Sequence, residues 1–118
     1  MFGMLTELKT KLRGRCVLTG CFTTATTSAP TAQQGDGVAA YSATGVYTVT
    51  MPNTGGTVES VFAQIDNGAD GDLIVVRAGY VPATGVLTIG VRDISGAGYA
   101  NSTGLVVSYI VILHGRAD

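Results

Sequence analysis

The sequence predicts an all-β fold: an antiparallel β-sandwich or jelly roll of about seven short strands, with a short N-terminal helix or arm. The 118 residues are rich in Gly, Thr, Val and Ala, a mixture that suits extended strands joined by tight turns. Apolar and hydroxyl side chains alternate in runs such as Val46 to Thr50, which is typical of half-buried antiparallel strands. A chain of this length fits one hydrophobic core.

The N-terminal residues predict a short helix that ends at Gly14. Four apolar residues between Met1 and Leu12 recur at helical spacing on one side: Met4, Leu5, Leu8 and Leu12. Residues 1–34 are expected to hold this basic helix, a first strand and an extended arm. Residues 35–118 are expected to form the body of the sandwich.

The first strand is expected over Arg15 to Thr24, and Ala25 to Gly37 predicts a long polar connection, either an extended arm or a surface loop. Six further strands, each bounded by Gly, Pro, Asn or Asp, are expected at Val38–Tyr41, Val46–Met51, Val58–Ile65, Asp72–Val81, Val86–Ile94 and Leu105–Leu113. The last of them is almost continuously apolar. Such a strand is covered on both faces, either at the centre of the sandwich or at a subunit contact.

An internal echo links two of these strands. Ala43-Thr44-Gly45-Val46-Tyr47-Thr48-Val49-Thr50 is matched by Ala83-Thr84-Gly85-Val86-Leu87-Thr88-Ile89-Gly90, and each copy predicts a turn that leads into a strand. A repeat architecture needs at least about three units. We therefore favour convergence of two hairpins over a true repeat.

Charge is sparse and unevenly distributed. Charged residues make up 13% of the chain, about half the usual share of roughly 25%, so exposed strand edges have little protection and burial in an oligomer is favoured. The formal net charge of -1 argues against a nucleic-acid binder. Four basic residues crowd the N-terminal arm: Lys9, Lys11, Arg13 and Arg15. They form either the polar side of an amphipathic helix or an anchor for an acidic partner surface.

The cysteines and the start of the chain bear on its compartment. Cys16 and Cys21 lie five positions apart in an expected strand, on opposite faces and too far apart for a disulfide. Neither a signal peptide nor an apolar run of membrane-spanning length is evident in the sequence. We expect production or assembly in a cytosol-like compartment.

No catalytic, cofactor or metal site is expected, so the chain is not expected to be an enzyme. His114 stands near the C-terminus with no second His and no cysteine pair beside it, which leaves too few ligands for zinc. Asp66 to Asp72 holds several acids and glycines, but the spacing departs from a calcium-binding loop and a hairpin turn explains it better. Glu59 and Asp93 show no pairing as general acid and base. The five tyrosines are expected in the core or at an interface: Tyr41, Tyr47, Tyr80, Tyr99 and Tyr109.

Four stretches carry a family resemblance: Gly35 to Thr50, Ser60 to Gln64, Val91 to Gly96, and the closing Val106–Leu113 strand. They contain a G-x-Y/F-T-V-T strand, a V-x-D-x-S-G turn and a terminal apolar strand. In this combination the chain resembles small structural proteins of tailed-bacteriophage virions, over most of its length from Gly35 to Leu113.

The resemblance implies a capsid decoration or cement protein. Such a protein would be a homotrimer on the outer capsid surface, assembled in the host cytoplasm, that clamps neighbouring major capsid subunits. Lys9, Lys11, Arg13 and Arg15 would then reach across the capsid as an anchor. Two alternatives are a tail- or head-fibre tip that binds a host receptor or glycan, which the lack of Trp and of a fibre stem disfavours, and a small enzyme or sugar-binding jelly roll.

Overall fold

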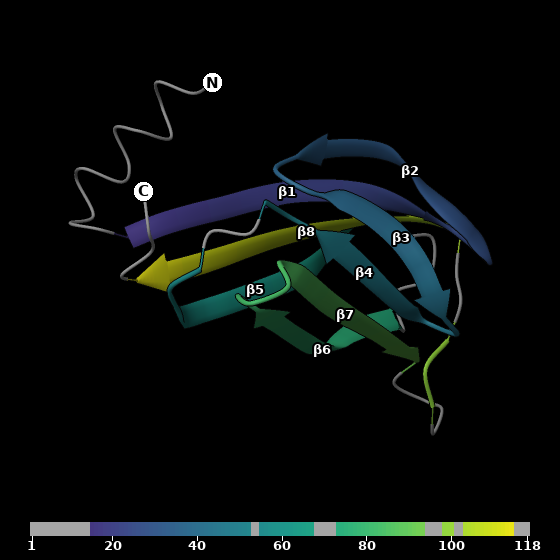
Figure 1. Cartoon of the computed structure of the whole chain (residues 1–118). Coiled ribbons are helices and arrows are strands. Elements are labelled where there is room, and N and C mark those ends of the chain that lie inside the picture. Colours follow the sequence, from purple (N-terminus) through teal and green to yellow (C-terminus); the bar gives the residue numbers. More distant parts are fainter. Residues whose placement is uncertain (1–14, 53–54, 68–72, 94–97, 101–102, 115–118) are drawn as a thin grey trace.

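A computed structural model describes residues 15–52, 55–67, 73–93, 98–100 and 103–114. Eight strands follow one another along the chain (Figure 1). Their bounds are β1 Arg15–Ala25, β2 Ser28–Gly35, β3 Val38–Ala43, β4 Val46–Thr50, β5 Thr57–Asn67, β6 Leu73–Val81, β7 Val86–Asp93 and β8 Thr103–His114. The N-terminal helix expected within Met1 to Leu12 lies outside the described residues.

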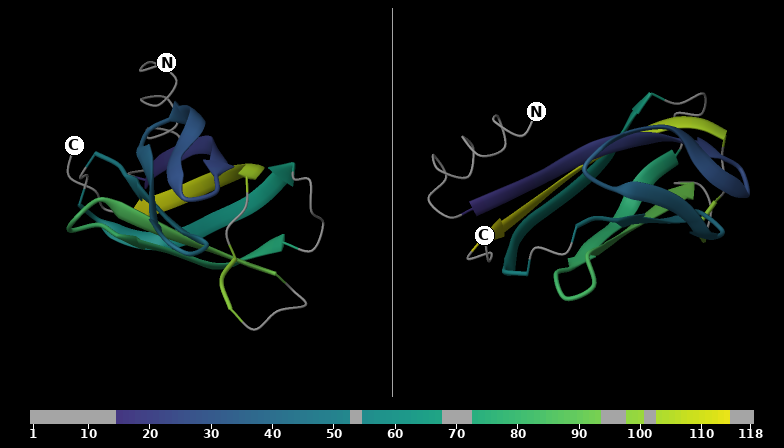
Figure 2. Two further views of the ribbon diagram at one scale, coloured as in Figure 1. Left: turned by 90° about the vertical axis from the view of Figure 1, so that its right-hand side faces the viewer. Right: turned by 45° about the horizontal axis from the view of Figure 1, so that its top comes forward.

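The strands form two four-stranded antiparallel sheets. Sheet A has the order β2-β1-β8-β5, and sheet B has the order β3-β4-β7-β6. Figure 2 shows the two layers from two further sides. Three connections are hairpins within one sheet, and the other four lead from one sheet to the other. The predicted antiparallel β-sandwich is therefore confirmed.

The polar connection expected over Ala25 to Gly37 is wrong, because this stretch contains strand β2. β2 pairs with β1 at the edge of sheet A, and the register shifts twice along the pair. Only Pro30 is buried among its eight residues. An edge strand held mainly by backbone hydrogen bonds needs no apolar alternation, so the pattern typical of a strand is missing.

β8 is an inner strand of sheet A, but the expected cover on both faces is wrong for the described residues, because its outer side is open and Ile110 is 40% exposed. It pairs with β1 on one side, from Arg15 opposite His114 to Ala25 opposite Thr103, and with β5 on the other. Alternate residues point into the sandwich and are fully buried: Leu105, Val107, Tyr109, Val111 and Leu113. β8 is hydrogen-bonded along both of its edges, so it connects β5 to the β1–β2 pair in sheet A.

Aromatic side chains join the two sheets in the core. The ring centroid of Phe22 on β1 lies 5.7 Å from that of Tyr47 on β4 and 6.4 Å from that of Tyr109 on β8. The hydroxyl of Tyr109 reaches over Gly20, where a Cβ atom would collide with it and with the backbone of Gln34. Glycine at position 20 thus leaves room for the buried tyrosine. Of the five tyrosines expected in the core or at an interface, Tyr47, Tyr80 and Tyr109 belong to the core, Tyr41 packs against it, and Tyr99 is 42% exposed.

The sequence echo maps onto the two central strands of sheet B. Thr48 of β4 is opposite Thr88 of β7, with Val46 opposite Gly90 and Thr50 opposite Val86. Each strand follows a tight turn whose glycine, Gly45 or Gly85, has a positive φ of 64° or 73°. The two copies are thus neighbouring hairpins arranged with an approximate twofold relation between Thr48 and Thr88.

Gln33 joins the edges of the two sheets. Its amide nitrogen donates to the carbonyl of Ala39 at 3.0 Å, and its amide oxygen accepts from the Ala39 N–H at 2.8 Å. The side chain therefore pairs with β3 much as the backbone of a neighbouring strand would. This closes the sandwich on the side where β2 and β3 lie.

Candidate binding surfaces

The outward side chains of β1, β8 and β5 form the outer face of sheet A. Three rows cross these strands, because residues paired in the ladders project to the same side. The rows are Val17–Ile112–Ser60, Thr19–Ile110–Phe62 and Cys21–Ser108–Gln64. Asp66 follows Gln64 on β5 at one end of this face, and Arg15 and His114 lie at the other.

The middle of this face is apolar and open to solvent. Phe62 is 62% exposed and Ile110 is 40% exposed, and they are directly opposite each other on β5 and β8. Val17 and Ile112, in the next row, are half-buried. A contiguous exposed patch of apolar side chains, unlike a single exposed residue, often marks a contact site.

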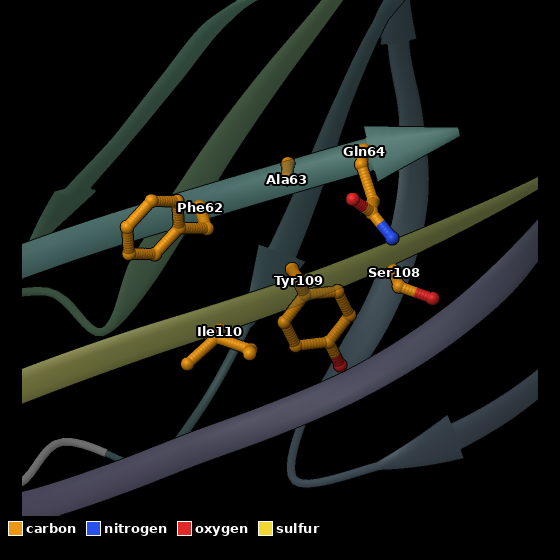
Figure 3. A pocket seen from close by; sticks show the side chains of 6 residues that line it. All are labelled: Phe62, Ala63, Gln64, Ser108, Tyr109 and Ile110. Carbon is orange, nitrogen blue, oxygen red and sulfur yellow. The ribbon is translucent and has the colours of Figure 1, made fainter. Parts of the chain in front are cut away.

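A depression of about 290 Å³ lies between β5 and β8 on sheet A. Phe62, Ala63 and Gln64 line it from β5, and Ser108, Tyr109 and Ile110 line it from β8 (Figure 3). Phe62 and Ile110 make one half of its rim apolar, while the amide of Gln64 and the hydroxyl of Ser108 make the other half polar. It is the amphipathic part of this face.

Asp66 does not line the depression itself, but it lies beside the polar half of the rim and is bonded to both polar rim residues. Its carboxylate accepts hydrogen bonds from the Gln64 amide at 2.7 Å and from the Ser108 hydroxyl. These bonds, that from Ser108 first, lower the pKa of Asp66 below its ordinary value, because they favour the charged form. The carboxylate is therefore ionised at neutral pH and held in place by two neighbouring side chains.

The opposite end of the face carries an ion pair. Arg15 donates from Nε to Glu59 at 2.7 Å, and Nδ1 of His114 lies 3.8 Å from the other oxygen of Glu59. The hydrogen bond from Arg15 lowers the pKa of Glu59, and the same bond raises the pKa of Arg15. Solvent-exposed pairs of this kind add little stability, so the contact chiefly orients the Arg15 side chain.

The outer face of sheet B has a different character. One row runs across all four strands as Ala40–Thr48–Thr88–Gly79, and the next runs as Val38–Thr50–Val86–Val81. Every member of these two rows is small or β-branched, so this part of the face is flat. Beyond the two rows, the Tyr99 ring lies over Gly90 and Ile74 is 42% exposed. Val38 and Val81 at its two edges are 67% and 53% exposed. The exposed basic residues beside these rows are Arg77 on β6 and Arg92 on β7.

Most of the predicted anchor falls outside the described residues. Lys9, Lys11 and Arg13 lie there, and Arg15 is the first residue of β1, held by Glu59. Of the stretch Asp66 to Asp72, residues 68–72 also lie outside the description. Among the residues that are described, no three His, Cys, Asp or Glu side chains gather closely enough to hold a metal ion.

The two cysteines lie on opposite faces of β1, as predicted. Cys16 points into the core and is buried, whereas Cys21 is opposite Ser108 on the outer face of sheet A. They are not joined by a disulfide.

The sequence analysis missed the group Phe62, Gln64, Asp66 and Ser108. The alternation Phe-x-Gln-x-Asp on an expected strand does place the first three on one face. That this face is the outer one, and that Ser108 lies opposite Gln64, depends on the β5–β8 register. The register is a tertiary property and has no local signal.

No protein-family model, curated protein or solved structure matches this chain at a significant level. Within the described parts of the chain, no helical segment has the length and apolar character needed to span a membrane.

Proposed function

We propose that this chain is a virion structural protein that decorates the outer surface of a phage capsid and stabilises contacts between major capsid subunits. The proposal extends the resemblance carried by Gly35 to Leu113. The role is one of binding and needs no catalysis. It requires a surface that can lie flat against another protein assembly.

The observation that carries the proposal is the outer face of sheet B. Of its three complete rows, one ends in Arg77 and the other two hold only Ala, Gly, Thr and Val side chains. Such residues lose little or modest rotamer freedom when they are buried, so docking costs less entropy than it would on a face of long side chains. Small side chains also let a partner surface approach the sheet closely.

Charge indicates which partner surface would fit. Arg77 and Arg92 flank the flat face, and Lys9, Lys11, Arg13 and Arg15 of the proposed anchor carry the same sign. An acidic partner surface would attract both groups and set the orientation of docking. We propose that the major capsid protein presents such a surface in the expanded shell.

The mechanism is thermodynamic linkage. A protein that binds only the expanded shell stabilises that shell in proportion to the logarithm of its concentration above the dissociation constant. We propose a homotrimer as the binding unit, since sparse charge leaves strand edges to be covered by association. Light scattering should then give three times the chain mass of 12.0 kDa.

The test is to mix the purified protein with expanded capsids that lack it, and to sediment the shells. We expect saturation at a fixed ratio to the major capsid protein and a higher melting temperature of the shells. Arg77→Glu should weaken shell binding by tenfold or more, about the effect of one close charge contact. The matched control is Phe62→Ser on the opposite face, which should bind like the wild type.

Two results would contradict the proposal. Shells that do not retain the wild-type protein would exclude the capsid role altogether. Loss of shell binding in Phe62→Ser, with full binding by Arg77→Glu, would instead place the docking surface on sheet A.

A further inference from the structure

We propose that the depression on the outer face of sheet A binds a neutral pyranose sugar, with Phe62 as the stacking surface and Asp66 as the hydrogen-bond acceptor. The site lies on the face opposite to the proposed capsid contact, so a docked protein would present it outward. The inference goes beyond the capsid role and does not depend on it.

The size of the depression limits the ligand. Its volume of about 290 Å³ is just below the range of roughly 300–1,000 Å³ that small-molecule sites occupy. One or two sugar rings fill such a space, whereas a folded protein surface would contact the whole face.

The apolar half of the rim fits one side of a pyranose. The face of an aromatic ring is electronegative, and the axial C–H groups of a sugar carry partial positive charge. Phe62 is 62% exposed and lies opposite Ile110, so a sugar ring can lie over the phenyl group and touch the isoleucine. This contact removes from water the most exposed apolar side chain of the face.

The polar half of the rim fits sugar hydroxyl groups. An ionised carboxylate offers about four lone-pair positions, of which Gln64 and Ser108 use two in Asp66. The remaining positions can accept from two adjacent hydroxyls of one sugar. The hydrogen bonds from Gln64 and Ser108 already fix the carboxylate, so binding need not order it.

The charge of Asp66 selects against acidic sugars. Its carboxylate is ionised, and no cation among the described residues lies next to it on this face. His114 is six residues from Ser108 along β8, or about 20 Å, and Arg15 lies opposite His114 on β1. A sialic or uronic acid would therefore meet repulsion without compensation, which leaves neutral hexopyranoses as the expected class.

The test uses saturation-transfer NMR on the purified full chain. The probes are methyl β-D-galactopyranoside, methyl β-D-glucopyranoside and N-acetylneuraminic acid. A shallow site of this size should bind a single neutral sugar with a dissociation constant on the order of 1 mM. We expect transfer to at least one neutral glycoside, strongest at the protons of one ring face, and none to N-acetylneuraminic acid.

Variants locate the site. Phe62→Ala should weaken binding about tenfold, and Asp66→Asn should also weaken it by removing the charged acceptor. Val81→Ala, an exposed apolar residue on the other face, is the matched control and should leave binding unchanged. Because Phe62 and Asp66 are exposed, both variants should keep the wild-type fold, which the melting temperature checks.

Three outcomes would overturn the inference. They are no transfer to either neutral glycoside, unchanged binding in Phe62→Ala, and equal binding of the acidic sugar. These three outcomes do not depend on the shell-binding assay. Failure of the sugar-binding proposal can therefore be distinguished from failure of the capsid proposal.

Discussion

The two outer faces of the sandwich differ in almost everything except backbone geometry. Sheet A presents Phe62, Ile110 and Ile112 beside an ordered carboxylate, and its surface is hollowed. Sheet B presents two flat rows of Ala, Gly, Thr and Val, and its larger side chains, Ile74 and Tyr99, lie beyond them. Inward side chains are all constrained by one shared core, whereas outward side chains are constrained only by what each face contacts. We base the two proposed binding roles on this difference.

The largest expected effect comes from removing a core contact between the two sheets. Phe22 contacts Tyr47 in one sheet and Tyr109 in the other, so Phe22→Ala should lower the free energy of unfolding by about 3–5 kcal/mol. Chemical denaturation measures it. Spectroscopic probes on the two sheets should report one shared unfolding transition. Phe62→Ala, the same substitution at a surface position, should lower the free energy of unfolding far less. Two separate transitions would show that the sheets fold independently.

A smaller effect should be confined to sheet A. Gly20→Ala places a Cβ against the Tyr109 hydroxyl and the backbone of Gln34, and overpacking of this kind costs about 1–3 kcal/mol. Hydrogen exchange should increase in β1 and β2 while sheet B keeps its protection. Gly79→Ala is the matched control, since a Cβ there meets nothing within 4 Å. Equal loss of protection in both sheets would contradict this assignment.

The smallest effect concerns charge on the outer face of sheet A. The pKa of Asp66 is lowered in the folded state, so its contribution to stability is present above the unfolded pKa and is lost as pH falls through the folded pKa. Denaturation of wild type and Asp66→Asn should differ at neutral pH and converge in strong acid. Ser108→Ala should narrow that difference, because it removes the larger cause of the shift. If the stability difference between the wild type and Asp66→Asn persisted in strong acid, ionisation of Asp66 would not be its cause.

Much of the fold could be predicted because most strands carry the alternation that a half-buried sheet requires. Val46–Met51, for example, was expected where β4 spans Val46–Thr50, and Leu105–Leu113 was expected where β8 spans Thr103–His114. β2 could not be predicted in the same way. Ala32 has a positive φ of 49° there, and β2 forms an irregular edge that depends on β1 for its partners.

The candidate site was less predictable than the fold. The basic residues Lys9, Lys11, Arg13 and Arg15 were conspicuous as a group in the sequence, and their proposed role as an anchor stays a prediction. Asp66 was considered only as the start of an acidic turn, and Phe62 only as part of the resemblance, because a Phe and an Asp in a strand are ordinary until their neighbours are known. Ser108 lies 42 positions from Asp66 in the chain, and only the pairing of β5 with β8 joins them.

The pairing of Arg15 with His114 has a consequence for engineering. The first residue of β1 and the last residue of β8 are opposite each other in one ladder, so the described chain enters and leaves the sandwich at the same place. Domains with adjacent entry and exit points tolerate circular permutation and insertion into loops of other proteins. A short linker from His114 to Arg15, with new ends opened in the exposed turn at Thr84, should give a permuted scaffold that retains both faces.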